Sequence, residues 1–185
     1  MSESKINLRK KILKKRKAID STQKHKKELS LANKLSEHTI YKQAKKIAIY
    51  YPLHDELSTM QAIRNAWDGK KQVFLPIINY VHKRLLFAEY DENTKLKPNK
   101  YSIYEPEDKG KALGDLGLDC LILPAIAVDI NGYRLGYGQG WYDKTLASCP
   151  KEQLPYTIVV GYQECLLKTV YPEPHDIRAD AIITV

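Results

Sequence analysis

The chain has 185 residues, of which 43% are hydrophobic and 28% are charged, the composition of an ordinary globular protein. This length predicts one domain, residues 1–185, with its own apolar core. The three cysteines form no C-x-x-C pair, and the longest apolar run, residues 120–128, is too short to span a bilayer. The charged N-terminus lacks a signal-peptide pattern, so we expect a cytoplasmic protein with no membrane partner. We separately expect a monomer.

Positive charge is concentrated at the amino-terminal end. The net charge is +8, yet residues 1–46 hold 15 Lys or Arg against four acidic residues and carry +11 on their own. We therefore divide the chain into a basic helical segment, 1–46, and a core, 47–185. A solvated helix face accounts for most of these lysines, but the excess also suits an anionic partner: a nucleoside triphosphate, a polyglutamylated cofactor or nucleic acid.

Two helices and a short third are predicted over the first 46 residues. Apolar residues recur at a helical period among lysines over residues 4–19, and residues 20–22 (Asp-Ser-Thr) break this helix and cap the next. The second helix runs to about His38 with Leu31 and Leu35 on its buried side. The short third helix covers residues 41–45.

The first half of the core alternates between strands and one helix. Residues 47–51 form an apolar strand that Pro52 closes. Ser58 or Thr59 caps a helix over residues 60–68, and Gly69 stops it. Strands follow over residues 73–78 and 85–90, and residues 97–106 form a loop that carries Tyr101.

The second half contains the most apolar strand. Residues 120–128 form one continuous strand of the kind that is covered on both faces, followed by a glycine-rich loop and a helix over 140–147. A strand over 157–161, a short helix over 164–168 and a strand over 181–185 complete the chain. This alternation predicts a three-layer α/β fold, with a largely parallel open sheet and helices on both faces. Ligands of such sheets lie beyond the carboxyl ends of the strands, so residues 51–56 and the glycine-rich loop should face one crevice.

The glycine-rich loop, residues 131–143, is the most informative segment. Glycine stands at positions 132, 136, 138 and 140, and its freedom to take positive φ lets backbone N–H groups converge on a phosphate chain. The start of the next helix adds partial positive charge, Arg134 adds a cation, and Asp143 adds an oxygen ligand suited to Mg²⁺. The spacing fits neither the dinucleotide fingerprint nor the Walker A loop, and a glycine-rich turn without a ligand stays open as an alternative.

Several segments together resemble the 5-formyltetrahydrofolate cyclo-ligases, also called methenyltetrahydrofolate synthetases. The loop is similar to the family pattern G-x-R-L-G-x-G-x-G-[YFW]-[YF]-D, with Pro124 and Asp129 before it. Residues 5–9 (Lys-Ile-Asn-Leu-Arg) resemble the opening K-x-x-L-R, and residues 55–59 (Asp-Glu-Leu-Ser-Thr) resemble D-E-[IVL]-x-T. Residues 173–176 and 180–184 resemble the family's ending. The matches follow the family's order over positions 5–184.

The resemblance implies an ATP- and Mg²⁺-dependent enzyme. Its substrate would be 5-formyltetrahydrofolate, with or without a polyglutamate tail, and its products 5,10-methenyltetrahydrofolate, ADP and phosphate. The formyl oxygen would be phosphorylated and N10 would then close the ring, a reaction that needs positioned charge more than a nucleophilic side chain. The resemblance also implies a three-layer α/β fold with a basic helical N-terminal segment.

Residue by residue, the resemblance implies the following site. Arg134 and Asp143 would act in catalysis, and Asp143 and Asp180 would hold Mg²⁺. The nucleotide would contact Lys5, Ile6, Asn7, Leu8, Arg9, Arg134, Leu135, Gly136, Tyr137, Gly138, Gln139, Gly140, Trp141 and Tyr142. The folate would contact Arg9, Tyr51, Glu56, Tyr101, Tyr137, Gly138, Gln139, Gly140 and Trp141, with Glu56 accepting two N–H groups of the pterin edge.

Two positions depart from the family pattern, and two alternative functions stay open. Gln139 stands where many relatives have Gly or Lys, so a phosphate-binding cation is missing there, and Trp141 replaces the more usual Tyr.

The alternatives are a basic nucleic-acid-binding protein and an α/β enzyme that acts on sugar phosphates. We expect no nucleic-acid partner, because no basic-aromatic RNA motif or helix-turn-helix accompanies the lysines.

Overall fold

The computed structural model describes residues 5–53 and 55–185, so position 4 of the first predicted helix and His54 lie outside the described residues. The amino-terminal segment forms three helices, α1 (Lys5–Lys17), α2 (Ser21–Glu37) and α3 (Thr39–Gln43). The predicted helix break is confirmed, because the Asp20 carboxylate accepts the N–H of Gln23 and caps α2.

Six strands form the central sheet: β1 (Lys46–Ala48), β2 (Gln72–Asn79), β3 (Arg84–Glu89), β6 (Cys120–Leu123), β9 (Tyr156–Gly161) and β11 (Ala181–Thr184). Their order is β11-β9-β6-β1-β2-β3, and all neighbours pair in parallel except β2 and β3. The predicted mixed α/β fold with a mostly parallel sheet is confirmed. From β1 the chain moves to β2 on one side and later to β6 on the other. The carboxyl ends of β1 and β6 therefore frame the place where ligands bind in open sheets.

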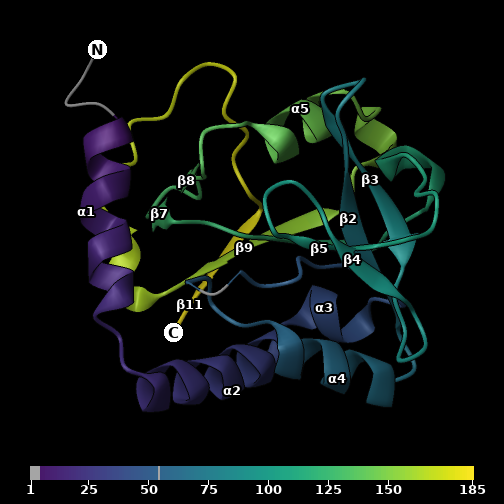
Figure 1. The fold of residues 1–185 in the computed structure, drawn as a ribbon, viewed down its shortest axis with the longest axis horizontal. Helices are drawn as coiled ribbons and strands as arrows, with labels where there is room; N and C mark the ends of the chain where they lie inside the picture. Colours follow the sequence, from purple (N-terminus) through teal and green to yellow (C-terminus); the bar gives the residue numbers. More distant parts are fainter. Residues whose placement is uncertain (1–4, 54) are drawn as a thin grey trace.

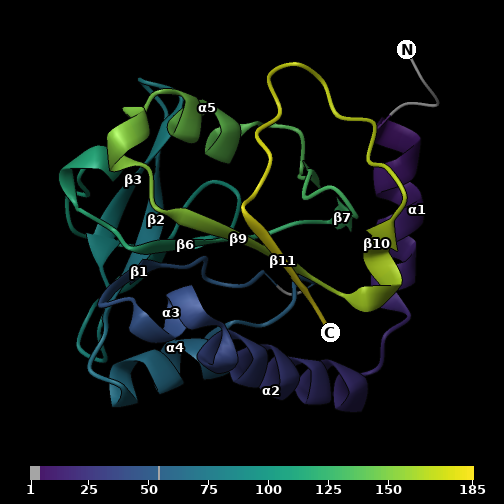
Figure 2. The same cartoon turned by 180° about the vertical axis from the view of Figure 1, so that it is seen from behind.

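The helices cover the two faces of the sheet unequally (Figures 1 and 2). One face carries α2, α3 and α4 (Met60–Asp68), with α2 packed against α4, whereas the other carries α5 (Trp141–Ala147). At the side of the sheet stands α1, near a small separate sheet of β7 (Ala127–Asp129), β8 (Arg134–Leu135) and β10 (Leu166–Leu167). The basic first helix is therefore free to contact loops at this side instead of a sheet face.

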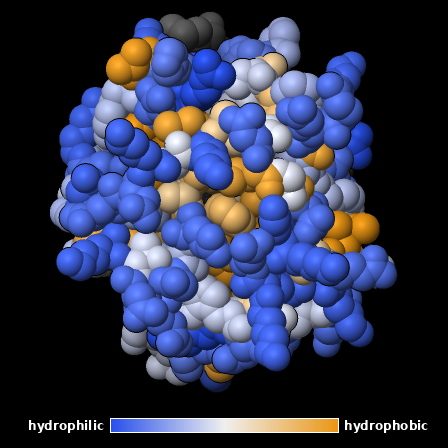
Figure 3. All heavy atoms as spheres, turned by 90° about the vertical axis from the view of Figure 1, so that its right-hand side faces the viewer, coloured by the Kyte–Doolittle hydropathy of each residue, from blue (hydrophilic) through white to orange (hydrophobic). Residues whose placement is uncertain are grey.

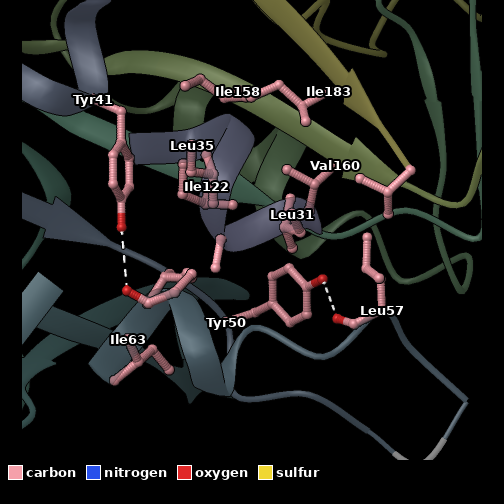
Figure 4. Packing of buried hydrophobic residues seen from close by; sticks show 14 of the residues in the cluster. Leu31, Leu35, Tyr41, Tyr50, Leu57, Ile63, Ile122, Ile158, Val160 and Ile183 are labelled. Carbon is pink, nitrogen blue, oxygen red and sulfur yellow. Dashed lines mark hydrogen bonds between the residues drawn. The ribbon is translucent and has the colours of Figure 1, made fainter. Parts of the chain in front are cut away.

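The central strands are buried on both faces, as parallel strands are when other elements cover them. Along β6, Ile122 packs in the apolar cluster on the α2 and α4 face, while Leu121 and Leu123 belong to the cluster on the α5 face. Figure 4 shows the first cluster, in which Tyr50 Oη donates to Leu57 O at 2.6 Å. This bond fixes the loop after β1 against the core.

The single strand predicted over residues 120–128 is wrong. The ladder of β6 ends at Leu123, which pairs with Val159, because Pro124 lacks the N–H that the next bond would need. The chain turns out of the central sheet and resumes as β7, which pairs with β8 and β10. The break leaves residues 124–126 at the carboxyl end of β6.

Shorter predictions also differ in detail, although the helix over residues 60–68 is confirmed as α4. The first strand ends at Ala48, the predicted helix over 164–168 is a 3-10 turn (Gln163–Cys165) followed by β10, and the loop over 97–106 belongs to a hairpin of β4 (Leu96–Pro98) and β5 (Tyr104–Pro106). Two more 3-10 turns cover Leu113–Asp115 and Lys151–Gln153. The N-cap of α4 is Thr59, but its Oγ1 donates to Tyr50 O. The first N–H groups of the helix are bound instead by Ser58 Oγ, which accepts from Met60 N at 3.4 Å, and by Glu28 Oε1 of α2, which accepts from Gln61 N at 3.1 Å.

Edge strand β3 lies on the side of the molecule that is to the right in Figure 1. Figure 3 shows that hydrophilic residues dominate this side and that a group of apolar residues lies between them. The edge strand β3 is partly covered, because Phe87 and Lys111 exchange two backbone hydrogen bonds. Among the described residues, no helix is long and apolar enough to cross a membrane.

Candidate functional site

A cavity of about 480 Å³ opens at the carboxyl ends of β1 and β6. Its walls come from the loops after these two strands, from β2 and β3, from the β4–β5 hairpin, and from the glycine-rich loop with the start of α5. The lining residues are Tyr50, Tyr51, Leu53, Glu56, Pro76, Ile78, Leu85, Tyr101, Ile103, Tyr104, Glu105, Pro124, Ala125, Ile126, Arg134, Gly136, Tyr137, Gln139, Gly140, Trp141, Tyr142 and Asp143. The two loops that the sequence assigns to one crevice thus share this cavity.

The glycine-rich loop keeps backbone N–H groups unpaired. Gly138 and Gly140 have φ of +97° and +65°, conformations that other residues adopt only under strain. Among the described residues, no backbone carbonyl accepts the N–H of Tyr137, Gly138 or Gln139. Gly140 is the N-cap of α5, which has only seven residues. The loop amides, more than a long helix dipole, are therefore available to an anion.

Arg9 reaches from α1 to this loop. Its Nε donates to Gly136 O at 2.7 Å, and its guanidinium carbon lies 3.5 Å from the position that a Cβ at Gly138 would take. A Cβ there would only touch the guanidinium, so glycine is required at 138 by its positive φ and not by lack of space. The contact joins two segments that are 127 positions apart in the chain.

Arg134 and Asp143 form an ion pair at the base of the loop. Arg134 Nη2 donates to Asp143 Oδ1 at 2.7 Å, and Arg134 Nη1 donates to Ile177 O at 3.0 Å. The side chains are 5% and 18% exposed, and Asp143 Oδ1 also accepts the N–H of Ile177. Because Asp143 neutralises its charge, Arg134 fastens the loop to the segment before β11 and is less available to a phosphate than the sequence indicates.

Glu56 contributes a buried carboxylate to the cavity wall. Its exposed fraction is 9%, and Oε2 accepts the N–H of Leu53 at 3.0 Å. Burial raises the pKa of Glu56, while the Leu53 N–H and the charge of Arg16 oppose that shift. A carboxylate held in this way can accept a pair of N–H groups from a ring edge.

Six tyrosines and one tryptophan make the cavity walls largely aromatic. Tyr51 lies tilted against Tyr104, with ring centroids 5.6 Å apart. Trp141 meets Tyr80 edge-on at 6.0 Å, and Tyr80 lies 6.4 Å from Tyr101. The three rings that the resemblance assigns to the folate, at 51, 101 and 141, all line the cavity and offer flat apolar surfaces to a ligand ring.

Lys5 and Asp180 lie outside the cavity lining. Lys5 Nζ donates to Asp176 Oδ2 at 2.6 Å, and although burial opposes it, this bond and the Glu173 N–H hold the pKa of Asp176 below its usual range. Asp180 Oδ2 accepts the N–H and the hydroxyl of Thr157 at 2.8 and 2.7 Å, at the amino end of β9. Asp180 thus binds the start of β9 and is not among the residues that line the cavity.

A metal ion would need ligands from outside the protein at this site. Within residues 5–53 and 55–185, no group of three His, Cys, Asp or Glu side chains could hold a metal ion. Mg²⁺ commonly binds one or two carboxylates together with substrate phosphates and water, so a site of this kind still fits the carboxylate of Asp143.

The remaining predicted nucleotide contacts lie away from the cavity lining. Ile6 and Asn7 face solvent, whereas Leu8 packs against the apolar core. Leu135 is buried in β8, where its carbonyl accepts the N–H of Ile126. These four side chains therefore face solvent or pack in the protein interior. In α1, it is Arg9 that contacts the loop.

Sequence reasoning missed two cations near the cavity. Lys144 Nζ donates to Gln139 O at 2.8 Å and lies 3.9 Å from the position of a Cβ at Gly140, so it brings to the loop the positive charge that residue 139 lacks. Its helical spacing of four from Gly140 was the available signal. Arg16 is 1% exposed and donates to Ala125 O, and its place in the apolar register of α1 was the signal there.

Comparisons with known proteins identify the family. The chain matches the 5-formyltetrahydrofolate cyclo-ligase family over residues 1–185. It is 35% identical to the 5-formyltetrahydrofolate cyclo-ligase of Haemophilus influenzae, over 78% of this chain and 79% of that protein, and 32% identical to that of Escherichia coli K12, over 94% and 96%. The NMR structure of Aquifex aeolicus 5,10-methenyltetrahydrofolate synthetase has the same fold, with a TM-score of 0.82 at 24% identity over 97% of this chain and 89% of that one. The chain therefore belongs to the 5-formyltetrahydrofolate cyclo-ligase family of enzymes.

Proposed function

We propose that the chain catalyses the ATP- and Mg²⁺-dependent cyclisation of 5-formyltetrahydrofolate to 5,10-methenyltetrahydrofolate, with release of ADP and phosphate. The contact of Arg9 with Gly136 and Gly138 carries the proposal, because it assembles a cationic glycine loop at a cavity that also holds Glu56. Such a loop suits a polyphosphate, and a buried carboxylate among aromatic rings suits a pterin. The family membership supports this reaction.

The chemistry requires an activated formyl oxygen, because that oxygen is a poor leaving group. Transfer of the γ-phosphoryl group breaks its bond to ADP and forms a bond to the formyl oxygen, which gives an iminium phosphate at N5. The N10 lone pair then attacks the formyl carbon, N10 loses its proton, and phosphate departs with the electrons of the C–O bond. No step needs a nucleophilic side chain, so the protein contributes mainly alignment and charge.

At the nucleotide end, the loop amides at residues 137–139 donate to phosphate oxygens. Arg9 and Lys144 lie against the same loop and neutralise phosphate charge. Arg134 acts indirectly, since its ion pair with Asp143 holds the loop and the carboxylate in place. Lys5 acts indirectly as well, through its ion pair with Asp176.

We assign the metal-binding role to Asp143 and Asp176, in place of Asp143 and Asp180. Within the described part of the chain, the hydrogen bonds of Asp143 go to Oδ1, which leaves Oδ2 for a metal ion. Asp176 directly precedes Ile177, whose N–H binds Asp143. The bonds of Asp176 to Lys5 and Glu173 both go to Oδ2 and leave Oδ1 for the metal ion, whereas Asp180 binds Thr157 at the amino end of β9 and has, among the described residues, no bond that links it to Asp143. When bound, Mg²⁺ would neutralise charge on the phosphate oxygens.

At the folate end, Glu56 accepts hydrogen bonds from the 2-amino group and from the N3–H of the pterin, since an ionised carboxylate has two acceptor oxygens. Tyr51, Tyr101 and Trp141 flank the pterin and benzoyl rings. The aromatic walls also keep water from the iminium phosphate, which water would otherwise hydrolyse back to the formyl compound.

Turnover with both ligands tests the proposal. Purified protein, MgATP and 5-formyltetrahydrofolate should give the ultraviolet absorption of the methenyl product, and reactions that lack either ligand serve as controls. An unchanged spectrum in the complete mixture would contradict the proposed activity. A filter-binding titration with RNA over a range of salt concentrations addresses the nucleic-acid alternative, for which tight binding with a steep salt dependence is expected.

A further inference from the structure

Arg16 of α1 is buried with most of its donors unused. Its exposed fraction is 1%, and its Nη1 donates to Ala125 O at 3.4 Å. Within residues 5–53 and 55–185, neither Nε nor Nη2 of Arg16 has an acceptor. A buried guanidinium without partners is strongly unfavourable, and sites that break a packing rule in this way are commonly sites of function.

The position of Arg16 relates it to the cavity. Arg16 follows Arg9 by seven residues, which places it two turns further along the same side of α1. Arg9 contacts the glycine-rich loop, whereas Arg16 contacts Ala125, which lines the cavity. The Arg16 guanidinium also lies 5.7 Å from the centre of the Tyr162 ring, whose Oη donates to the backbone carbonyl of Glu56. One cation of α1 is thus near the nucleotide end and another near the Glu56 end.

The charge of Arg16 acts on two ionisable groups of the cavity wall. Burial raises the pKa of Glu56, and Arg16 opposes this shift. Burial and the Glu56 charge raise the pKa of Tyr137 to about 12, and Arg16 opposes this shift too. Tyr137 is 48% exposed, so its ring can turn away from the guanidinium when a ligand enters.

A purely structural role accounts for Arg16 less well. Its hydrogen bond to Ala125 O is long, at 3.4 Å, and although the guanidinium is close enough to the Tyr137 hydroxyl to oppose the rise in its pKa, Nε and Nη2 have no acceptor within hydrogen-bond geometry among the described residues. The helix is already fastened by Lys5 to Asp176 and by Arg9 to Gly136. An apolar side chain of similar length would fill the same space without burying an unpaired charge.

We propose that Arg16 is a folate-binding residue. Its free N–H groups donate hydrogen bonds to the carbonyl oxygen at C4 of the pterin ring, beside the two N–H groups that donate to Glu56. The inference rests on the proposed function. The edge of a pterin presents this acceptor next to its two donors, and a guanidinium beside a carboxylate is its complement. The C4 oxygen projects on the same side of the ring system as N5, with only C4a between C4 and N5, so a hydrogen bond to this oxygen orients the formyl group toward the phosphate-binding loop.

Binding measurements on Arg16→Met test the proposal, because methionine keeps the length and removes every donor. Calorimetric titrations with 5-formyltetrahydrofolate and, separately, with MgATP give two dissociation constants, and thermal unfolding without ligand gives the stability. We expect the folate dissociation constant to rise at least tenfold, that of MgATP to stay within twofold, and the melting temperature to stay or rise. Lys17→Gln is the matched control, since it removes one charge from an exposed position of α1.

A substrate analogue locates the contact. A 4-amino analogue of 5-formyltetrahydrofolate carries a donor in place of the C4 oxygen, so Arg16→Met should weaken its binding less than threefold. Four results would each overturn the assignment of Arg16. The variant could bind 5-formyltetrahydrofolate as tightly as the unaltered protein does, or lose as much affinity for MgATP as for the folate. It could also unfold at a lower temperature, or lose as much affinity for the analogue as for 5-formyltetrahydrofolate. If the unaltered protein binds neither 5-formyltetrahydrofolate nor its analogue, the proposed function itself is wrong, and this result is distinct from the others.

Discussion

Gly136 gives the sharpest test of the phosphate-binding loop, because an added methyl group meets no protein atom there. A Cβ built at Gly136 has nothing within 4 Å, and the residue is outside the positive-φ region. The carbonyl that accepts from Arg9 is unaffected by the substitution. Gly136→Ala should therefore raise the free energy of unfolding by about 0.4–1 kcal/mol, because alanine restricts the unfolded chain.

The same methyl group should impair nucleotide binding. It projects into the open space at the cavity wall where we place the phosphates, and a displacement of about 1 Å at a reacting group can lower a rate on the order of 100-fold. We expect the KM for MgATP to rise roughly tenfold or more, which corresponds to about 1.4 kcal/mol. At this chain length, the gain in stability corresponds to a rise in melting temperature of about 1–4 °C.

Thermal unfolding without ligands and steady-state kinetics with varied MgATP measure the two effects. Gly132→Ala is the matched control, since Gly132 has φ of +91° and its Cβ would stand 2.9 Å from Ala179 O, outside the cavity lining. That variant should lower the melting temperature and leave the KM for MgATP unchanged. A Gly136→Ala protein with an unaltered KM for MgATP would refute the phosphate-binding role of the loop.

Three further substitutions separate the parts of the site. Glu56→Gln should raise the KM for the folate more than that for ATP, because an amide has one acceptor oxygen, and equal effects would remove Glu56 from the pterin edge. Since burial raises the pKa of Glu56, folate affinity measured by calorimetry should fall as the pH falls through that raised pKa, and the variant should lose this dependence. Asp143→Ala should nearly abolish turnover in a Mg²⁺ titration, whereas Asp180→Asn should lower only the melting temperature; the reverse pattern would restore Asp180 as a ligand. Lys144→Gln should raise the KM for ATP roughly tenfold through loss of a charge-assisted contact, and an unchanged KM would leave Lys144 without a nucleotide role.

Local signals in the sequence predict those elements whose ends are set by neighbouring residues. The helix over residues 60–68 is found in full because Gly69 stops it directly after an amphipathic stretch. The cap at Asp20 is predicted correctly because a side-chain oxygen directly before a helix commonly accepts an unpaired N–H of the first helical turn. The meeting of the two strand-to-helix loops follows from the geometry of parallel sheets, which needs no knowledge of individual contacts.

The pairing of charged groups could not be predicted in this way. Lys5 pairs with Asp176, 171 positions away, and Arg134 pairs with Asp143 instead of facing an open phosphate site. A sequence shows which residues carry charge, but only the folded chain shows which charges neutralise each other. Asp180 illustrates the same limit, since its sequence position before a strand does not show that its carboxylate accepts the backbone N–H and the hydroxyl of Thr157.

These pairings show what several cations of the basic first helix do in the folded protein. Few side chains of α1 are buried, namely Ile12 and Arg16, so apolar packing alone holds the helix weakly. Its long-range hydrogen bonds come instead from cations spaced along its length, with Lys5 near the carboxylates, Arg9 on the glycine-rich loop and Arg16 behind the cavity wall. The cations of a helix held in this way bind anions and carbonyl oxygens. A nucleotide and a folate bound together would supply both kinds of acceptor. The sequence leaves the excess charge open to a solvated face or a nucleic-acid partner. In the structure, Arg9 and Arg16 bind carbonyl oxygens of residues that line one cavity, whereas Lys5 pairs with Asp176 outside that lining.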